Sequence, residues 1–126
     1  MKTDKTTWAG RALTVLALPP FLMGAFMMLT KNTQALEGMT KLGWPRSSMT
    51  TILALELGCL ALYLIPWTAA LGAVLLTGYL GGAVATHLRA GESAAMPVIV
   101  GAIVWGGIYL REPRLRALLP FRKPPA

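Results

Sequence analysis

The sequence is poor in charge, and above all in negative charge. Only 13% of its 126 residues are charged, and five acidic residues stand against twelve basic ones. Ordinary soluble domains have about 25% charged residues, and each surface helix of a soluble bundle needs a polar face. Apolar residues make up 55% of the chain. The composition therefore excludes an ordinary soluble domain and favours a protein that lies in a membrane.

Cysteine and histidine are equally scarce, with one residue of each, Cys59 and His87. A single cysteine excludes a disulfide within the chain and a redox-active cysteine pair. One histidine, one cysteine and scattered carboxylates do not form a recognisable ligand set, so we expect no metal. The sequence also shows no nucleophile placed with a base, no glycine-rich phosphate loop and no paired carboxylates. We therefore predict no self-contained catalytic centre.

Long apolar runs are what the chain does have. Positions 49–88 hold forty residues, and Glu56 is the only one of them with a certain charge. At about 1.5 Å per residue, forty helical residues extend about 60 Å, enough for two crossings of a ~30 Å hydrocarbon layer. Two further runs, 12–29 and 94–110, have 18 and 17 residues, near the minimum for one crossing each. The sequence predicts one all-α domain, residues 1–126, that forms a bundle of four transmembrane helices. These helices cover about 8–29, 48–65, 67–88 and 94–111.

The basic residues are distributed unevenly between the two sides of this bundle. Eight lie in the segments at the chain ends and four in the loops on the opposite side. By the positive-inside rule, both termini are predicted to be cytoplasmic in a multi-pass protein of the cytoplasmic (inner) membrane. Topology thus accounts for the net charge of +7, and we expect membrane lipids rather than nucleic acid as partners. The eight are Lys2, Lys5, Arg11, Arg111, Arg114, Arg116, Arg122 and Lys123, and the four are Lys31, Lys41, Arg46 and Arg89.

Glu56 is the most unusual residue of the apolar runs. A carboxylate without a role at that depth in a bilayer costs a few kcal/mol, so we expect Glu56 to serve in ligand binding, proton handling or assembly. At 100° per residue, it shares one stripe of its helix with Met49, Ile52, Cys59, Leu60 and Tyr63. We expect this stripe to face the bundle interior.

Polar residues of the third predicted helix approach the same side of the membrane. We predict that Glu56 shares a polar pocket with Tyr79, Thr86 and His87, and that Lys31 reaches it from the loop above. A histidine at a helix end is also a common interfacial residue, so both interpretations of His87 stay open.

Small residues predict two helix-packing faces, because they let backbones approach closely. These are Ala54, Gly58 and Ala61 in the second helix, and Gly78 and Gly82 in the third.

Three stretches resemble the DoxX-like family of small four-helix membrane proteins: LGWP, LALELGCLALYLIP and ALGAVLLTGYLGGAVATHLRAGE. The resemblance covers roughly residues 41–92, and its most specific parts are the glutamate of the second helix and the ending THLRAGE. It implies a four-helix bundle in the cytoplasmic membrane. It also implies functional roles for Glu56, Thr86, His87 and Arg89, and identifies Lys31 with the lysine that follows the first helix in the family.

Relatives in that family have been linked to a subunit of a thiosulfate:quinone oxidoreductase, to membrane complexes that handle oxidative stress and, more distantly, to a chaperone for receptor assembly. Three hypotheses follow. The first is a redox accessory that binds a quinone or another lipophile, at most a subunit of a membrane oxidoreductase. Glu56, His87 and Tyr79 would supply hydrogen bonds and a proton route. Its apolar slot would be lined by Met23, Phe26 and Met27.

The second hypothesis is an assembly factor whose polar groups bind a transmembrane helix of another protein. The third is a small proton-coupled exporter, because small multidrug-resistance transporters also have four helices and an essential membrane glutamate. Their glutamate lies in the first helix, whereas Glu56 lies in the second. The first two hypotheses require a membrane or membrane-associated partner protein, or assembly into a homo-oligomer.

Overall fold

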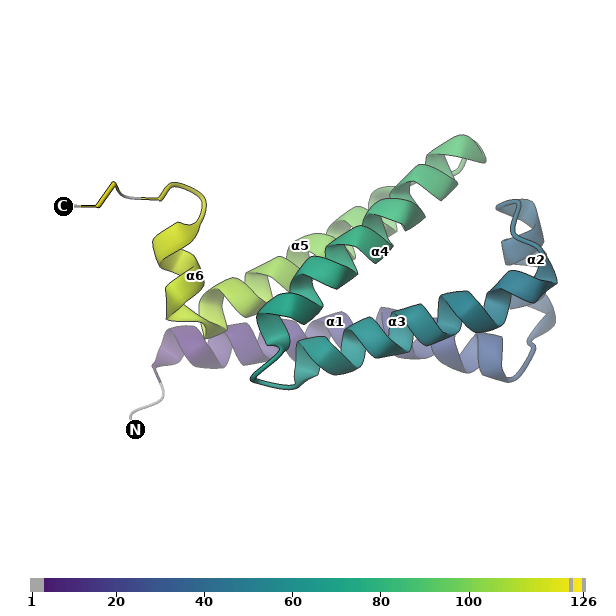
Figure 1. Cartoon of the computed structure of the whole chain (residues 1–126). Coiled ribbons are helices and arrows are strands. Elements are labelled where there is room, and N and C mark those ends of the chain that lie inside the picture. Colours follow the sequence, from purple (N-terminus) through teal and green to yellow (C-terminus); the bar gives the residue numbers. More distant parts are fainter. Residues whose placement is uncertain (1–3, 123, 126) are drawn as a thin grey trace.

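The computed structural model describes residues 4–122 and 124–125, and it is a bundle of helices (Figure 1). No strand occurs among the described residues, so the predicted all-α class is confirmed. The elements are α1 (Lys5–Leu29), α2 (Thr33–Lys41), the 3-10 helix η1 (Arg46–Ser48), α3 (Met49–Leu64), α4 (Ala69–Arg89), α5 (Ala95–Arg111) and α6 (Pro113–Leu118).

Three of these units are long and apolar enough to cross a membrane: α1, α4 and the continuous stretch Arg46–Leu64. The fourth, α5, is apolar and has 17 residues. Large apolar side chains cover the outside of the bundle, as expected where the surrounding solvent is lipid. Among the most exposed are Trp8, Val15, Phe26, Leu29 and Trp67.

The four long helices lie close to the ranges predicted from the sequence, and the largest difference is the start of α1 at Lys5, three residues early. Two short helices, α2 and α6, were not among the predicted helices. The side chain of Asn32 caps α2 by accepting a hydrogen bond from the backbone N–H of Gln34 at 2.8 Å. With nine residues, α2 is too short to stand out from a loop by apolar periodicity alone.

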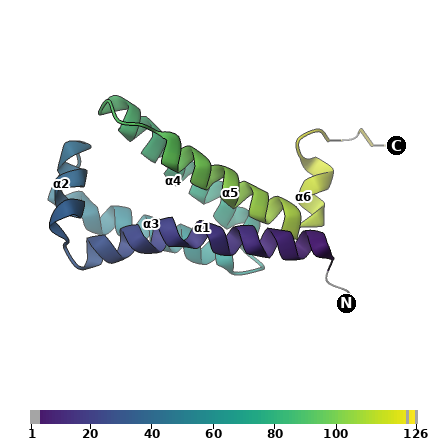
Figure 2. The same cartoon turned by 180° about the vertical axis from the view of Figure 1, so that it is seen from behind.

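The long helices form a ring in which α1 packs along α5 and α3 along α4, while contacts between α4 and α5 and between α1 and α3 close it (Figures 1 and 2). Both ends of the described chain lie at the same end of the bundle, opposite α2. Which side of the membrane this end faces remains a prediction. Lys2 and Lys123, two of the residues counted for it, lie outside the described residues.

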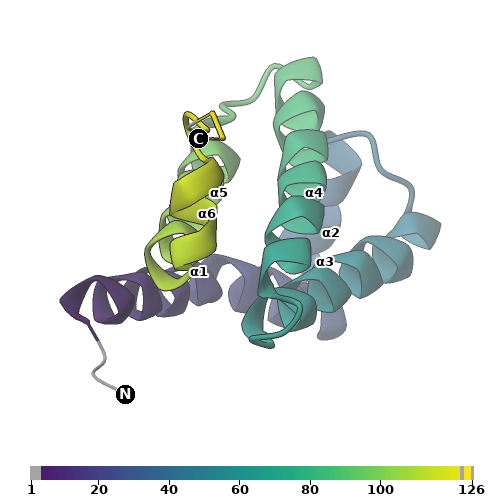
Figure 3. The same ribbon diagram turned by 60° about the vertical axis from the view of Figure 1, so that its left-hand side comes forward.

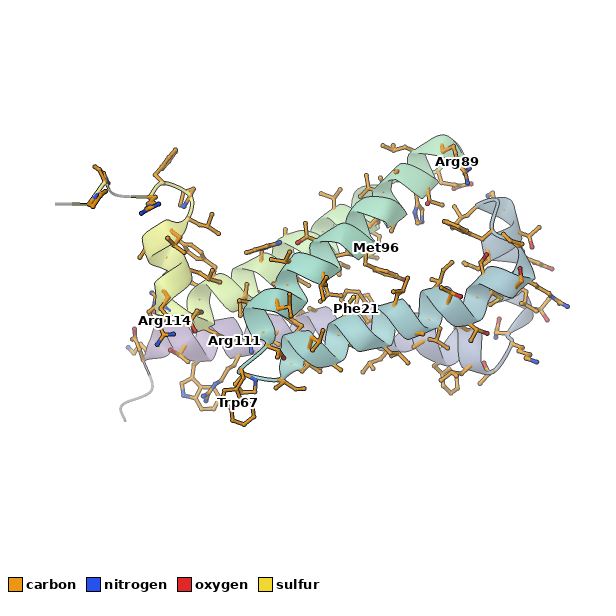
Figure 4. The ribbon with its side chains drawn as sticks, viewed as in Figure 1. Phe21, Trp67, Arg89, Met96, Arg111 and Arg114 are labelled. Atoms are coloured by element: carbon orange, nitrogen blue, oxygen red, sulfur yellow. The ribbon has the colours of Figure 1, made fainter. Side chains whose placement is uncertain are left out.

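Tyr63 is the centre of the buried core at the end of the bundle that holds the termini. Its side chain is completely buried, and its hydroxyl donates to the carbonyl of Val104 at 2.8 Å. The guanidinium of Arg111 lies 5.1 Å from the centre of its ring, where the negative face of the ring attracts a cation. Figure 4 shows Arg111 at this end of the bundle. The apolar members of the core are Ala17, Phe21, Leu60, Ala69, Ala73, Leu76, Leu80, Val100, Val104 and Ile108.

Two glycines let the helices approach this tyrosine closely. A Cβ added to Gly72 would lie 2.1 Å from the Tyr63 nitrogen, and one added to Gly107 would lie 2.7 Å from its hydroxyl. No real Cβ atom tolerates such distances, so the α3–α4 turn and the α3–α5 contact both require glycine.

The predicted packing faces are therefore corrected. A Cβ on any of the three predicted glycines would meet nothing within 4 Å, and the two alanines are exposed. Helical periodicity grouped the small residues of each helix correctly, but the group in α3 is exposed on the outside of the bundle, and the two glycines of α4 line an open space instead of packing against a helix. The residues concerned are Ala54, Gly58, Ala61, Gly78 and Gly82.

The bundle opens toward the end that carries α2. In α4 the last buried residue is Leu80, and the positions from Gly81 to Arg89 are all half-buried or exposed. Figure 3 shows α3 and α4 diverging from the short turn that joins them. Because the apolar core stops at Leu80, the outer half of α4 is available to form a site.

Candidate functional site: a crevice between α3 and α4

A crevice of about 420 Å³ occupies the open end of the bundle. Its volume lies within the range of about 300–1,000 Å³ that is typical of small-molecule sites. Three polar side chains of α4 line it, and most of the remaining wall is apolar. The polar lining is Tyr79, Thr86 and His87; the larger apolar lining residues are Met28 of α1, Ile52 and Leu55 of α3, and Met39, Leu42 and Trp44 from the end of α2 and the segment that follows it.

Glu56 lies directly behind this crevice. It follows Met49 by seven residues, which places it about 10 Å along α3 from the start of the helix. Only 4% of its surface is exposed, so the prediction that it faces the bundle interior is confirmed. The hydroxyl of Tyr79 donates a hydrogen bond to Glu56 Oε2 at 3.2 Å. The sequence left the direct partner of Glu56 open among four residues, and the structure selects Tyr79.

A glycine of α1 makes room for the other carboxylate oxygen. A Cβ on Gly24 would lie 3.6 Å from Glu56 Oε1, which is ordinary contact distance. Gly24 is not among the residues predicted for the site, and no signal in the sequence indicates it, because the approach of α1 to α3 is a tertiary contact. The carboxylate thus lies between α1 and α4, and Tyr79 connects it to the crevice.

Thr86 and His87 line the crevice, and each is fixed by its own helix. The hydroxyl of Thr86 donates to the Gly82 carbonyl at 2.8 Å. His87 Nδ1 lies 2.7 Å from the Ala83 carbonyl. A carbonyl can only accept, so Nδ1 carries the proton and, in the neutral ring, Nε2 is an acceptor. Among the described residues, no hydrogen bond joins His87 directly to Glu56.

Arg89 and Lys31 do not line the crevice with the other predicted residues. Arg89 Nη2 donates to the Leu42 carbonyl at 3.1 Å, and Figure 4 shows Arg89 at the end of α4. Lys31 lines a separate recess on another side of α2. The prediction of one shared pocket therefore fits Tyr79 and is wrong for Lys31. Arg89 is placed to position the crevice wall rather than to contact a ligand.

A second link joins the segment around the end of α2 to the segment around the end of α4. Lys41 Nζ, at the end of α2, lies 2.6 Å from Glu92 Oε1 in the α4–α5 loop. The hydrogen bond from Lys41, together with its positive charge, holds the pKa of Glu92 below its ordinary value. With the Arg89–Leu42 hydrogen bond, this ion pair holds Met39, Leu42 and Trp44 over the crevice.

The predicted apolar slot is also corrected. Met23 and Phe26 are exposed by 61% and 64%, and with Met27 they are absent from the crevice wall. Met28 of α1 lines the crevice instead, together with the residues after α2. The amphipathic composition of the stretch 33–41 could have indicated this cover, but only the fold shows that it closes over α3 and α4. Gly78 and Gly82, predicted to pack against a helix, line the crevice as well.

The arrangement suits the binding of a neutral lipophile that carries hydrogen-bonding oxygens. Tyr79 offers a hydroxyl and His87 a ring nitrogen in an otherwise apolar space, and Glu56 is a proton-exchanging group one hydrogen bond behind Tyr79. Among the described residues no group of three His, Cys, Asp or Glu side chains could hold a metal ion.

Comparison with known protein families gives a match over most of the chain. A family model described as the DoxX-like family matches residues 12–107, which include all four long helices in whole or in large part. No curated protein and no solved structure matches the chain.

Proposed function

Because the chain belongs to the DoxX-like family and is a membrane protein, we propose that it binds a quinone or a similar lipophile in the crevice between α3 and α4, as an accessory of a membrane redox system. The observation that carries this proposal is the hydrogen bond from Tyr79 to the buried carboxyl group of Glu56. It connects an apolar, ligand-sized space to a group that can exchange protons.

The chemistry of the pair depends on the proton of Glu56. When Glu56 is ionised, it accepts from Tyr79, and the phenolic oxygen keeps lone pairs for a donor such as a quinol hydroxyl. When Glu56 is protonated, it can donate to the Tyr79 oxygen, and the Tyr79 O–H turns to a ligand carbonyl. Reduction of a quinone consumes two electrons and two protons. This chain would supply a proton route, and a redox partner protein would supply the electrons.

We place the protein in the cytoplasmic membrane with both termini in the cytoplasm, which puts the crevice in the outer half of the bilayer. The proposed partner is another membrane or membrane-associated protein. The basic residues near the termini support this orientation by the positive-inside rule.

Ligand titration followed by tryptophan fluorescence tests the proposal, because Trp44 belongs to the crevice wall. A short-chain quinone should quench saturably, and Trp44→Phe should remove most of the signal. One hydrogen bond is worth about 0.5–1.5 kcal/mol, so Tyr79→Phe should weaken binding about twofold to tenfold.

Tyr109→Phe is the matched control, because the Tyr109 hydroxyl bonds the Leu119 carbonyl at an exposed site outside the crevice. Its affinity should equal that of the wild type. Glu56→Gln should keep binding but lose the dependence of binding on pH. Unsaturable quenching, or equal affinities for Tyr79→Phe and Tyr109→Phe, would contradict quinone binding in this crevice.

A second function, assembly of another membrane protein, is supported by the outward small-residue face of α3. Ala54, Gly58 and Ala61 leave a surface that a foreign helix can approach closely. Co-purification of a specific membrane protein that is lost in Gly58→Leu and kept in Gly38→Leu would favour this function. Identical recovery of the partner with both variants would argue against it.

A further inference from the structure

A second recess lies between the end of α1, helix α2 and the start of α3. Its volume is about 620 Å³, and Met28 is the one residue that it shares with the crevice. Its lining combines apolar side chains with two cations, Lys31 and Arg46. The apolar lining residues are Met28, Leu29, Leu36, Met49 and Leu53.

The two cations have no acidic partner across this recess. Within residues 4–122 and 124–125 the one ion pair found joins Lys41 to Glu92, so neither Lys31 nor Arg46 lies within ion-pair distance of a carboxylate. The acidic residue that lies between the two cations in the sequence is Glu37, which lines a neighbouring hollow together with Arg46 and Lys41. Glu37 is absent from the recess itself, so the charge that faces its interior is positive.

Backbone geometry holds Lys31 at this place. Its φ is +52°, a left-handed backbone conformation that residues other than glycine seldom adopt. Its N–H donates to the Met28 carbonyl at 3.2 Å, and the N–H of Asn32 donates to the Met27 carbonyl at 3.0 Å. The residue is therefore fixed between the end of α1 and the cap of α2 and does not belong to a free loop.

The start of α3 adds to the positive potential of the recess. The continuous helical stretch Arg46–Leu64 begins here, and Arg46, Met49 and Thr50 from its first turns line the recess. The N-terminus of a helix carries a partial positive charge that favours an anion. Three sources of positive charge thus meet at one end of an apolar space.

The level of the recess indicates what kind of anion fits. It lies where α1 ends and α3 begins, and both belong to helical units that are long and apolar enough to cross a membrane, so we expect the cations at the depth of lipid head groups. From there the apolar lining reaches Leu53, four residues into α3, which corresponds to about one helical turn into the hydrocarbon layer.

We propose that this recess binds the anionic head group of a membrane phospholipid, with Lys31 and Arg46 contacting the phosphate and the upper acyl chain lying on the apolar wall. The site is distinct from the crevice of the proposed function and does not depend on it.

Photo-crosslinking locates the lipid. The protein is placed in vesicles that contain phosphatidylglycerol with a diazirine in the upper acyl chain, and cross-linked peptides are mapped by mass spectrometry. We expect cross-links within residues 28–53, and fewer with a phosphatidylcholine of the same chains. Each cation near an anionic head group is worth about 1 kcal/mol, so Lys31→Gln with Arg46→Gln should lower this yield about 25-fold.

Lys41→Gln is the matched control, because Lys41 is a cation of the same region that is already paired and does not line the recess. Its yield should stay at the wild-type level. Cross-links near the basic residues 111–122 serve as an internal standard and should be unchanged in every variant.

The proposal would be overturned by equal yields with both lipids at residues 28–53, by an unchanged yield in the double variant, or by an equal loss in Lys41→Gln. Full competition by water-soluble glycerol phosphate would also overturn it, because the occupant would then be a soluble anion. The substituted side chains are exposed, and an unchanged melting temperature of each variant confirms that the fold is kept.

Discussion

Replacing Tyr79 with phenylalanine removes the hydroxyl that donates to Glu56 and leaves the ring in place. Glu56 is 4% exposed, and Tyr79 is the one side chain among the described residues that donates a hydrogen bond to its carboxyl group. Hydrogen bonds between membrane helices are worth about 0.6 kcal/mol on average and at most about 1.7 kcal/mol. A bond to an ionised group is worth about 1.5–3 kcal/mol. We expect Tyr79→Phe to lower the free energy of unfolding by about 1–2 kcal/mol, because it leaves a buried polar group without this partner.

A double-mutant cycle isolates the bond from the other effects of each substitution. The cycle combines Tyr79→Phe with Glu56→Met, which replaces the carboxyl group by an apolar chain of similar length, and unfolding is followed in mixed micelles. The coupling energy should be about 0.6–1.7 kcal/mol if Glu56 is neutral and larger if it is ionised. Tyr109→Phe, the exposed control, should change stability by less than about 0.5 kcal/mol. Strictly additive effects of Tyr79→Phe and Glu56→Met would refute the pairing.

Three other predictions concern packing, topology and the cover of the crevice. Gly72→Ala should lower the free energy of unfolding by at least about 1–3 kcal/mol through overpacking, because the added Cβ would collide with the backbone of α3. In the same unfolding assay, Gly78→Ala should be neutral or stabilising. A cysteine introduced at Asp4 should resist an impermeant thiol reagent added outside intact cells, and rapid labelling would reverse the orientation. The pKa of Glu92 is lowered. Its ion pair with Lys41 therefore stabilises the fold fully at pH values above the ordinary pKa of a glutamate, and this stabilisation is lost as the pH falls through the lowered pKa. Spin labels on α2 and on the α4–α5 loop should therefore move apart on acidification or at high salt, and a distance that is independent of pH would count against the ion pair as a link.

The residues of α3 show how far helical periodicity reaches. Glu56, Leu60 and Tyr63 are buried together, as one stripe of the sequence predicts, because a rotation of 100° per residue groups side chains whatever surrounds the helix. The same periodicity grouped Gly58 with Ala54 and Ala61, and in the structure these three residues are exposed together on α3. Periodicity left one question unanswered, namely which group meets a neighbouring helix. Gly58 faces outward, and Gly72 and Gly107 make the close contacts instead.

The sequence by itself determined the all-helical class and the membrane as the solvent, because charge is so rare over such long apolar runs. It also determined that the one buried carboxylate needs a polar partner. Only the tertiary structure decided that this partner is Tyr79, and that Lys31 belongs to another site. The partner of Glu56 depends on how far each helix rotates about its axis and where it diverges from its neighbour. Those two quantities are set by the close contacts of Tyr63 with Gly72 across the α3–α4 turn and with Gly107 of α5, and by the end of the core at Leu80. All three are contacts or limits between different helices, which the residue pattern of a single helix does not encode.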